Sequence, residues 1–169
     1  MAPCGPTFLD GYLPYVLRRA DQTLSAGFYA TLTRLGVARS EWRVLAVLHE
    51  LGELPVVDLA AAALSPQPTV THALRRLEQR QLVARTPGRH DRRQRLVSLT
   101  AAGAELTAAL IAEATRLEAD ALADADAGDL CELVERLRAL TAHVQQRLER
   151  RAEPAVAASP SPDADRRTP

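Results

Sequence analysis

The stretch that decides the fold is ELPVVDLAAAALSPQPTVTHALRRLEQRQLVARTPGRHDRRQRLVSLTAAG, residues 53–103. Its first part, residues 56–63, has the apolar spacing of a short helix. Ser65 followed by Pro66 predicts the cap and the first residue of a second helix, which runs to about Arg80. Two helices joined by a short turn are typical of a helix-turn-helix.

Two strand-like runs follow these helices, at residues 82–86 and 95–99. Between them lie Pro87, Gly88 and a cluster of charged residues, which predicts a hairpin with a long basic tip. Helix, turn, helix and hairpin in this order predict a winged helix-turn-helix. In such a motif the second helix enters the major groove of DNA.

The second helix has one apolar and one polar face when its residues are placed about 100° apart. The apolar face consists of Val70, Ala73, Leu74 and Leu77. The polar face offers a hydroxyl, an imidazole, an amide and two guanidinium groups. It consists of Pro68, Thr71, His72, Arg75, Arg76 and Gln79. Such groups suit base edges and phosphates. We therefore expect the helix and its N-terminal end to contact DNA through Ser65, Gln67, Pro68, Thr69, Thr71, His72, Arg75 and Arg76.

The formal net charge is zero, but the charges are segregated along the chain. Residues 65–95 hold eight Arg against two acidic residues, a balance of +6. Residues 100–130 hold seven acidic residues against one Arg, a balance of −6. A charged run is often only a solvated face, but here the basic run coincides with the expected DNA-binding helix and hairpin. The acidic run would keep the rest of the surface away from phosphate.

Amphipathic helices flank the winged motif on both sides. Apolar or small residues at spacings of three and four predict a long helix over residues 13–35, and a second helix follows over residues 40–51. After the hairpin, Thr100 caps a helix that continues to about Ala125, and a last helix runs to about Arg151. This last helix carries a continuous apolar seam at Leu130, Leu133, Val134, Leu137, Leu140, Val144 and Leu148.

One winged domain has too little surface to bury both the first helix and this seam, which favours a homodimer. The alternative is that both helices fold back onto their own domain. The expected fold is mainly α with a small β-hairpin wing. Its parts are a flexible N-terminal segment (1–10), a helical dimerisation region (11–39 and 100–151), a winged helix-turn-helix DNA-binding region (40–99) and a disordered tail (152–169).

The run HDRRQRLVSLTAAG, residues 90–103, together with the helices before it, resembles the MarR family of bacterial transcriptional regulators. The resemblance covers about residues 13–150 and implies a dimer that binds a pseudo-palindromic DNA operator. It also implies that Asp91 pairs with Arg93, whose side chain enters the minor groove. A guanidinium suits the negative potential of a narrow minor groove, and we expect Arg89 and Arg92 to contact phosphates. The alternative is that Asp91 and Arg93 form only a surface ion pair.

Enzymatic function is not expected from this sequence. The four His residues have no spacing that groups them, Gly-rich phosphate loops are absent, and Cys4 and Cys131 give neither a disulfide framework nor a metal motif. No apolar run is long enough to cross a membrane, and the N-terminus lacks the pattern of a signal peptide. We therefore expect a cytoplasmic protein without a metal or cofactor.

The resemblance also implies a repressor that a small ligand, often aromatic, releases from DNA. Its site is expected where the first two helices meet the dimerisation region. Aromatic and cationic residues that would suit an aromatic acid gather in this part of the sequence: Tyr12, Tyr15, Arg19, Trp42, Arg43 and His49. Trp42 could equally be a plain core residue. Two alternatives stay open for the whole chain, a winged-helix module that binds protein and a DNA-binding protein that responds to no ligand.

Overall fold

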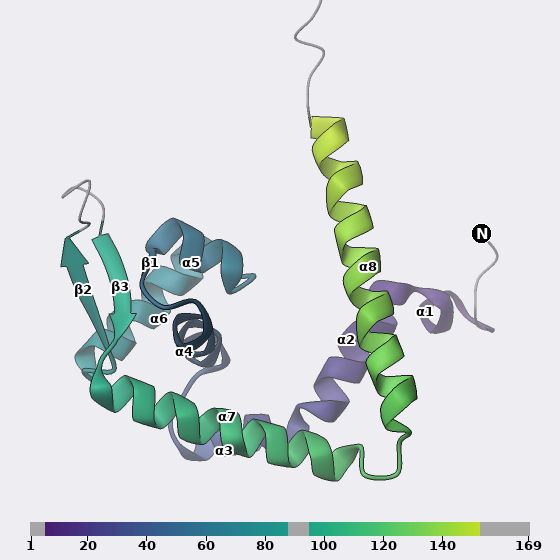
Figure 1. Ribbon diagram of the computed structural model, residues 1–169, viewed down its shortest axis with the longest axis horizontal. Helices are drawn as coiled ribbons and strands as arrows, with labels where there is room; N and C mark the ends of the chain where they lie inside the picture. Colours follow the sequence, from purple (N-terminus) through teal and green to yellow (C-terminus); the bar gives the residue numbers. More distant parts are fainter. Residues whose placement is uncertain (1–5, 88–94, 153–169) are drawn as a thin grey trace, which may run out of the picture. The chain divides into compact units, whose positions relative to one another are not determined.

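The computed structural model describes residues 6–87 and 95–152. The chain divides into two compact units, Met1–Ala123 and Asp124–Pro169. Within the described residues the fold is mainly helical with one small sheet, as the sequence predicts. The first unit contains α1 (Phe8–Gly11), α2 (Leu13–Leu24), α3 (Ala26–Arg34), α4 (Arg39–Leu51), β1 (Leu54–Pro55), α5 (Val56–Ala62), α6 (Gln67–Gln79), β2 (Val83–Pro87), β3 (Arg95–Leu99) and α7 (Ala101–Ala121) (Figure 1).

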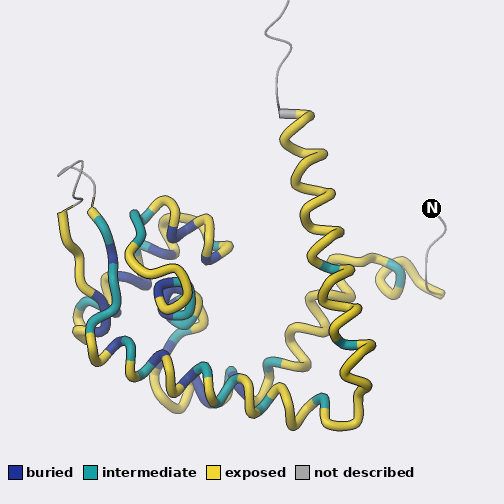
Figure 2. The backbone as a smooth tube through the Cα atoms, viewed as in Figure 1, coloured by how far each residue is buried: buried dark blue, intermediate teal, exposed yellow. Residues whose placement is uncertain are grey.

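The winged motif is built by α4, α5, α6 and a three-stranded antiparallel sheet of order β1-β3-β2. β3 lies in the middle, with Val97 opposite both Leu54 of β1 and Arg85 of β2. The predicted apolar face of α6 is buried in full, and Figure 2 shows the buried segments gathered where the helices and sheet of this motif meet. The residues that form this core are Val44, Leu45, Leu48, Leu59, Ala60, Ala63, Val70, Ala73, Leu74, Leu77, Leu82, Val83 and Val97.

The start of α6 differs from the prediction by one residue. Ser65 is not the cap: its hydroxyl donates to the carbonyl oxygen of Ala63 at 3.0 Å. Pro66 takes the cap position, with extended ψ of 140°, and Pro68 lies in the first turn. Prolines are tolerated there because the first N–H groups of a helix have no partner within it. The turn before them has Leu64 at φ 49°, a left-handed conformation that is uncommon for this residue.

The long first helix is also interrupted. Ser25 separates α2 from α3, and its N–H donates to the carbonyl oxygen of Asp21 at 2.9 Å. The Ser25 hydroxyl and the Tyr29 hydroxyl both approach the same carboxylate oxygen of Asp21, at 3.4 and 3.3 Å. Ser and Gly are common where helices kink, and Gly27 follows two residues later. A further single helical turn, α1, lies inside the segment expected to be flexible, with the Thr7 side chain as its cap.

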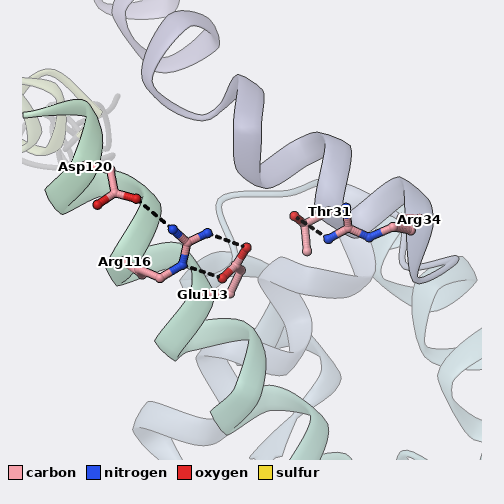
Figure 3. A network of polar contacts seen from close by, with 5 residues as sticks. All are labelled: Thr31, Arg34, Glu113, Arg116 and Asp120. Atoms are coloured by element: carbon pink, nitrogen blue, oxygen red, sulfur yellow. Dashed lines mark hydrogen bonds and ion pairs between the residues drawn. The ribbon is translucent and has the colours of Figure 1, made fainter.

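A second cluster of buried residues joins α3 to α7 and consists of Phe28, Leu32, Val37 and Leu110. Figure 3 shows polar side chains of the same two helices. Arg116 of α7 bonds Glu113 through its Nε at 2.9 Å and Asp120 through Nη1 at 2.7 Å. On α3 the Arg34 guanidinium donates to the Thr31 hydroxyl at 3.2 Å. The hydrogen bond from Arg116 lowers the pKa of Glu113, and desolvation opposes it less strongly. The charges of Arg116 and Arg34 lower this pKa further.

Helix α7 is joined to the winged motif at its first turn. The Thr100 hydroxyl accepts from Gly103 N at 3.0 Å, as expected of the cap, and donates to the carbonyl oxygen of Gln81 at 2.7 Å. Gly103 lies so close to Leu82 that a Cβ at this position would overlap the Leu82 carbonyl oxygen. The glycine is therefore required by the close approach of α7 to the turn after α6.

The second unit contributes one described helix, α8 (Ala127–Ala152). It begins slightly before the predicted restart at Gly128, because Asp126 caps it and its Oδ1 accepts from Gly128 N at 2.8 Å and Asp129 N at 3.0 Å. Most of the predicted apolar seam is exposed, at Leu133, Val134, Leu140, Val144 and Leu148. The predicted tail beyond this helix lies outside the described residues.

Candidate nucleic-acid interface

The exposed face of α6 carries most of the residues expected to contact DNA. Five of them line a single hollow of about 500 Å³ on the surface: Gln67, Pro68, Thr71, His72 and Arg75. His72 and Arg75 are exposed and form no ion pair within the described residues. Since Val70, Ala73 and Leu74 anchor the other side of the helix, this polar face is held outward by the core.

Thr71 shows how a side chain on this face is already oriented. Its hydroxyl donates to the carbonyl oxygen of Gln67 at 2.9 Å. The proton is therefore directed along the helix, and the oxygen lone pairs remain available as acceptors. Such an oxygen can accept from the amino group of adenine or cytosine in the major groove.

The other predicted residues of this helix lie apart from the hollow. Thr69 is exposed but does not line it, and Ser65 is half-buried with its hydroxyl turned to Ala63. Arg76 reaches the opposite way, toward α4, where its Nε lies 2.7 Å from Oε1 of Glu41. About half of the Arg76 side chain stays exposed.

Sequence reasoning missed the role of Glu41, a carboxylate with no solvent exposure. Its Oε2 accepts from Ala38 N at 2.8 Å and lies 3.8 Å from Nη1 of Arg80. The same Nη1 donates to the carbonyl oxygen of Gly36 at 3.0 Å. The only signal in the sequence is an acidic residue in the first turn of a helix, which does not indicate its partners on α6.

The base of the hairpin is fixed by polar contacts to neighbouring elements. Arg85 of β2 pairs through Nε with Oε1 of Glu78 on α6 at 2.6 Å. The Thr86 hydroxyl donates to Oε2 of Glu53 at 3.2 Å. The first contact holds β2 beside α6, and the second holds it to the residue that precedes β1. The tip with the predicted residues Arg89, Asp91, Arg92 and Arg93 lies outside the described residues.

The residues expected to bind a ligand are brought together only in part. Trp42 and Arg43 line a hollow of about 350 Å³ between α4 and the end of α5. The other residues that line this hollow are Ala46, Val47, Ala62, Ala63 and Leu64. Trp42 also packs edge-on against Phe28, with ring centroids 5.0 Å apart, and borders a smaller hollow of about 210 Å³ between α2, α3 and α7.

The remaining four predicted residues do not line these hollows. Tyr15 and Arg19 are exposed on α2, and Tyr12 precedes that helix with its ring stacked on Phe8 at 5.0 Å. His49 is exposed near the end of α4. Within the described residues no three His, Cys, Asp or Glu side chains are grouped as metal ligands would be. None of the described helices is long and apolar enough to span a membrane.

Comparison with known proteins identifies the family. The sequence model of the MarR family matches residues 37–94, which run from the start of α4 into the hairpin. A solved structure of a MarR family transcriptional regulator, SPO1453 from Silicibacter pomeroyi DSS-3, is 33% identical with a TM-score of 0.68, and the match covers 80% of this chain and 98% of that one. The chain belongs to the MarR family. It therefore belongs to a family of transcriptional regulators, as its sequence predicts.

Two further relatives of this MarR chain bear on its function. The HTH-type transcriptional regulator FarR of Neisseria gonorrhoeae is 33% identical over 90 residues, which are 53% of this chain and 62% of the length of FarR. A structure of BpsR from Bordetella bronchiseptica, solved to explain the regulation of its DNA binding by 6-hydroxynicotinic acid, is 28% identical with a TM-score of 0.70. That match covers 81% of this chain and 98% of BpsR.

Proposed function

We propose that this protein is a transcriptional repressor that binds a pseudo-palindromic DNA operator as a homodimer and is released by a small aromatic ligand. The observation that carries the proposal is the two-sided character of α6. One side is fully buried in the winged motif, and the other presents Gln67, Thr71, His72 and Arg75 around one hollow. A helix of this kind is the element that enters the major groove in winged helix-turn-helix proteins.

The side chains on α6 differ in what they would recognise. The Arg75 guanidinium suits the two acceptors of guanine or a phosphate, and the Gln67 amide suits the paired donor and acceptor of adenine. His72 and Thr71 add an imidazole and a hydroxyl between them along the helix. We expect these four residues to determine sequence preference and Thr69 and Ser65 to contribute at the N-terminal end.

The hairpin tip extends this proposal into the minor groove. In our proposal Arg93 enters the groove, Asp91 orients it, and Arg89 with Arg92 contacts phosphates. The contacts of β2 support this. The Arg85–Glu78 pair would limit how far β2 moves against α6, and the Thr86–Glu53 bond would limit how far it moves against the residue before β1. A restrained base lowers the conformational cost of placing a long side chain in a groove.

The exposed apolar residues support self-association. On α8 the exposed apolar residues recur at spacings of three and four, with Val134 and Leu137 among the residues that line a shallow groove along the helix. In the first unit α1 and α2 expose Phe8, Leu9, Tyr12, Leu13, Tyr15, Val16, Leu17 and Leu24. Large apolar patches on a soluble protein mark interaction sites, and a two-fold dimer would cover both sets.

The hollow beside Trp42 and Arg43 supports the proposal that an aromatic ligand binds. Its walls are apolar apart from the guanidinium, so an aromatic ring could lie against Trp42 while a carboxylate pairs with Arg43. BpsR, whose DNA binding is regulated by an aromatic acid, is similar to this chain over most of its length. Tyr12, Tyr15, Arg19 and His49 would contribute only through a rearrangement or through the partner chain.

The experiment that tests the proposed function is retardation of the DNA fragment that lies upstream of the gene encoding this chain. An unrelated DNA fragment is the control, at a salt concentration where it stays free. A winged module that binds protein instead of DNA would leave both fragments unretarded. Retardation of the upstream fragment alone supports the proposal. Loss of retardation on adding an aromatic acid, after a screen by thermal shift, supports the ligand-dependent part.

A further inference from the structure

The buried carboxylate of Glu41 lies between the first turn of α4 and the helix proposed to read DNA. It is the one acidic side chain with no solvent exposure among the described residues. Burying a charge is costly unless it is paired and hydrogen-bonded. The buried charge of Glu41 therefore needs partners that offset its cost, and these partners show which elements the carboxylate joins.

Both charged partners of Glu41 lie at the C-terminal end of α6, Arg76 in its last turn and Arg80 as its C-cap. Arg76 Nε lies 2.7 Å from Oε1, and Arg80 Nη1 lies 3.8 Å from Oε2. The third contact is local, from Ala38 N to Oε2 at 2.8 Å. Arg80 also donates to Gly36 O, so the two arginines join the end of α6 both to the segment between α3 and α4 and to the first turn of α4.

The Arg76 contact has a particular geometry. Although its nitrogen lies 2.7 Å from Oε1, no donor within the described residues points at that oxygen well enough to form a hydrogen bond. Charge attraction, which depends little on direction, therefore dominates this contact. Removing the charge while keeping the shape of the side chain should weaken the hold on Arg76 and leave the local bond to Ala38 in place.

The position of these arginines links the ion pairs of Glu41 to the DNA-binding face of α6. Arg76 directly follows Arg75, and His72 lies about one helical turn before Arg76. Arg75 and His72 both line the hollow. A rotation or shift of α6 at Arg76 would therefore move the hollow-lining side chains against the base edges. Phosphate contacts tolerate such a shift better than base contacts do, because they carry little sequence information.

We propose that Glu41 is a positioning residue: its buried carboxylate, held by Arg76 and Arg80, fixes α6 against the first turn of α4 and thereby sets sequence preference. This inference rests on the proposed function, since it assumes that α6 reads DNA. It assigns Arg76 a mainly structural role, in place of the direct contact expected from the helical wheel. Neutralising Glu41 leaves the positive charge of two arginines near the DNA uncompensated, so non-specific affinity for DNA should not fall with it.

The test compares Glu41→Gln in the full-length chain with wild type and with Glu113→Gln, which neutralises an exposed ion-paired carboxylate on α7. The probes are the upstream DNA fragment and an unrelated fragment of equal length, at one salt concentration. We expect Glu41→Gln to lower the ratio of the two affinities about tenfold, with affinity for the unrelated fragment unchanged or raised. Glu113→Gln should leave the ratio unchanged. An unchanged ratio in Glu41→Gln, or equal losses on both fragments, overturns the inference.

A second variant keeps the test valid where Glu41→Gln unfolds. Glu41→Met/Arg76→Met removes the carboxylate together with its nearer arginine, and replacement of a buried ion pair by apolar residues is often well tolerated. Circular dichroism establishes that the double variant is folded. We then expect the same loss of fragment preference, and full preference in this variant overturns the inference. If wild type itself fails to distinguish the two fragments, the proposed function fails, an outcome separate from a failure of the Glu41 assignment.

Discussion

At the scale of single residues, Arg75 is the side chain on α6 most suited to a direct DNA contact. It is exposed, lines the hollow with Thr71 and His72, and forms no ion pair within the described part of the chain. Its neighbour Arg76 is engaged by Glu41 instead. Two adjacent arginines that look equivalent in the sequence thus have different surroundings in the fold.

Arg75→Ala is expected to weaken binding to the upstream fragment by about 1–3 kcal/mol, roughly tenfold to a hundredfold. If the guanidinium contacts a phosphate, the slope of affinity against salt should also fall by about one ion. Arg116→Ala on α7 is the control, because that guanidinium is held by Glu113 and Asp120. Equal affinities for Arg75→Ala and wild type at moderate salt would remove Arg75 from the interface.

Glu113 gives a prediction about pH. The Arg116 guanidinium lowers the pKa of Glu113 in the folded protein, so the ionised carboxylate stabilises the fold at pH values above its unfolded pKa. That contribution is lost as the pH falls below about 4.3 toward the folded pKa. Glu113→Gln should therefore have a slightly lower Tm than wild type at neutral pH and the same Tm in acid. The effect is small because both side chains reach solvent.

The control for this measurement is Glu118→Gln, five residues further along α7. Glu118 forms no ion pair in the described residues. The difference in Tm between Glu118→Gln and wild type should therefore be the same at neutral and at acid pH. A Glu113→Gln difference that also stays constant with pH would rule out the Arg116 pair as its cause.

At the scale of elements, the joint between α7 and the winged motif depends on one glycine. Gly103→Ala would gain up to about 1 kcal/mol from helix propensity alone. Because the new Cβ would overlap the carbonyl oxygen of Leu82, we expect a net loss of about 1–3 kcal/mol instead. The measurement is the free energy of unfolding in urea.

Gly27→Ala on α3 is the matched control. There a Cβ would meet only the Leu117 side chain, at 3.7 Å, which is ordinary contact. This variant should gain about 0.5–1 kcal/mol. If both substitutions stabilise the protein, the close approach of α7 to Leu82 is wrong.

The elements also show how far the sequence could be interpreted. The apolar face of α6 and the cap at Thr100 follow from local spacing and chemistry, and the structure has both. The break at Ser25 was missed because apolar residues keep their helical spacing across it. β1 was missed because two residues carry no period, and pairing with β3 alone makes Leu54–Pro55 a strand.

The candidate site was predictable to a similar extent. Thr71, His72 and Arg75 follow from the helical wheel of α6, and Gln67 follows from its place at the N-terminal end of the helix. Ser65 was misjudged because it and Pro66 both fit the start of a helix, and only the turn at Ala63 and Leu64 decides between them. Glu41 escaped because its partners lie more than thirty residues away in the sequence and meet it only through the packing of α4 on α6.

At the scale of the whole molecule, α8 is the element whose sequence most needs a partner. Leu137→Glu with Val144→Glu would place two charges in its apolar seam, and charges are disfavoured in the core of an interface. We expect this variant to sediment as a monomer and to lose retardation of the upstream fragment. Gln146→Glu, about 180° around the helix from Leu137, should remain a dimer. A monomeric double variant that binds the fragment as wild type does would refute the dimeric model.

In the proposed dimer, two copies of α6 read DNA sequence together. Selection of binding sites from a pool of random duplexes by the full-length chain tests this most directly. We expect enrichment of an inverted repeat whose half-sites are centred about one helical turn apart, roughly 10 base pairs or 34 Å. Enrichment of no sequence, or of a single half-site without its inverted copy, would show that two copies of α6 do not read DNA together.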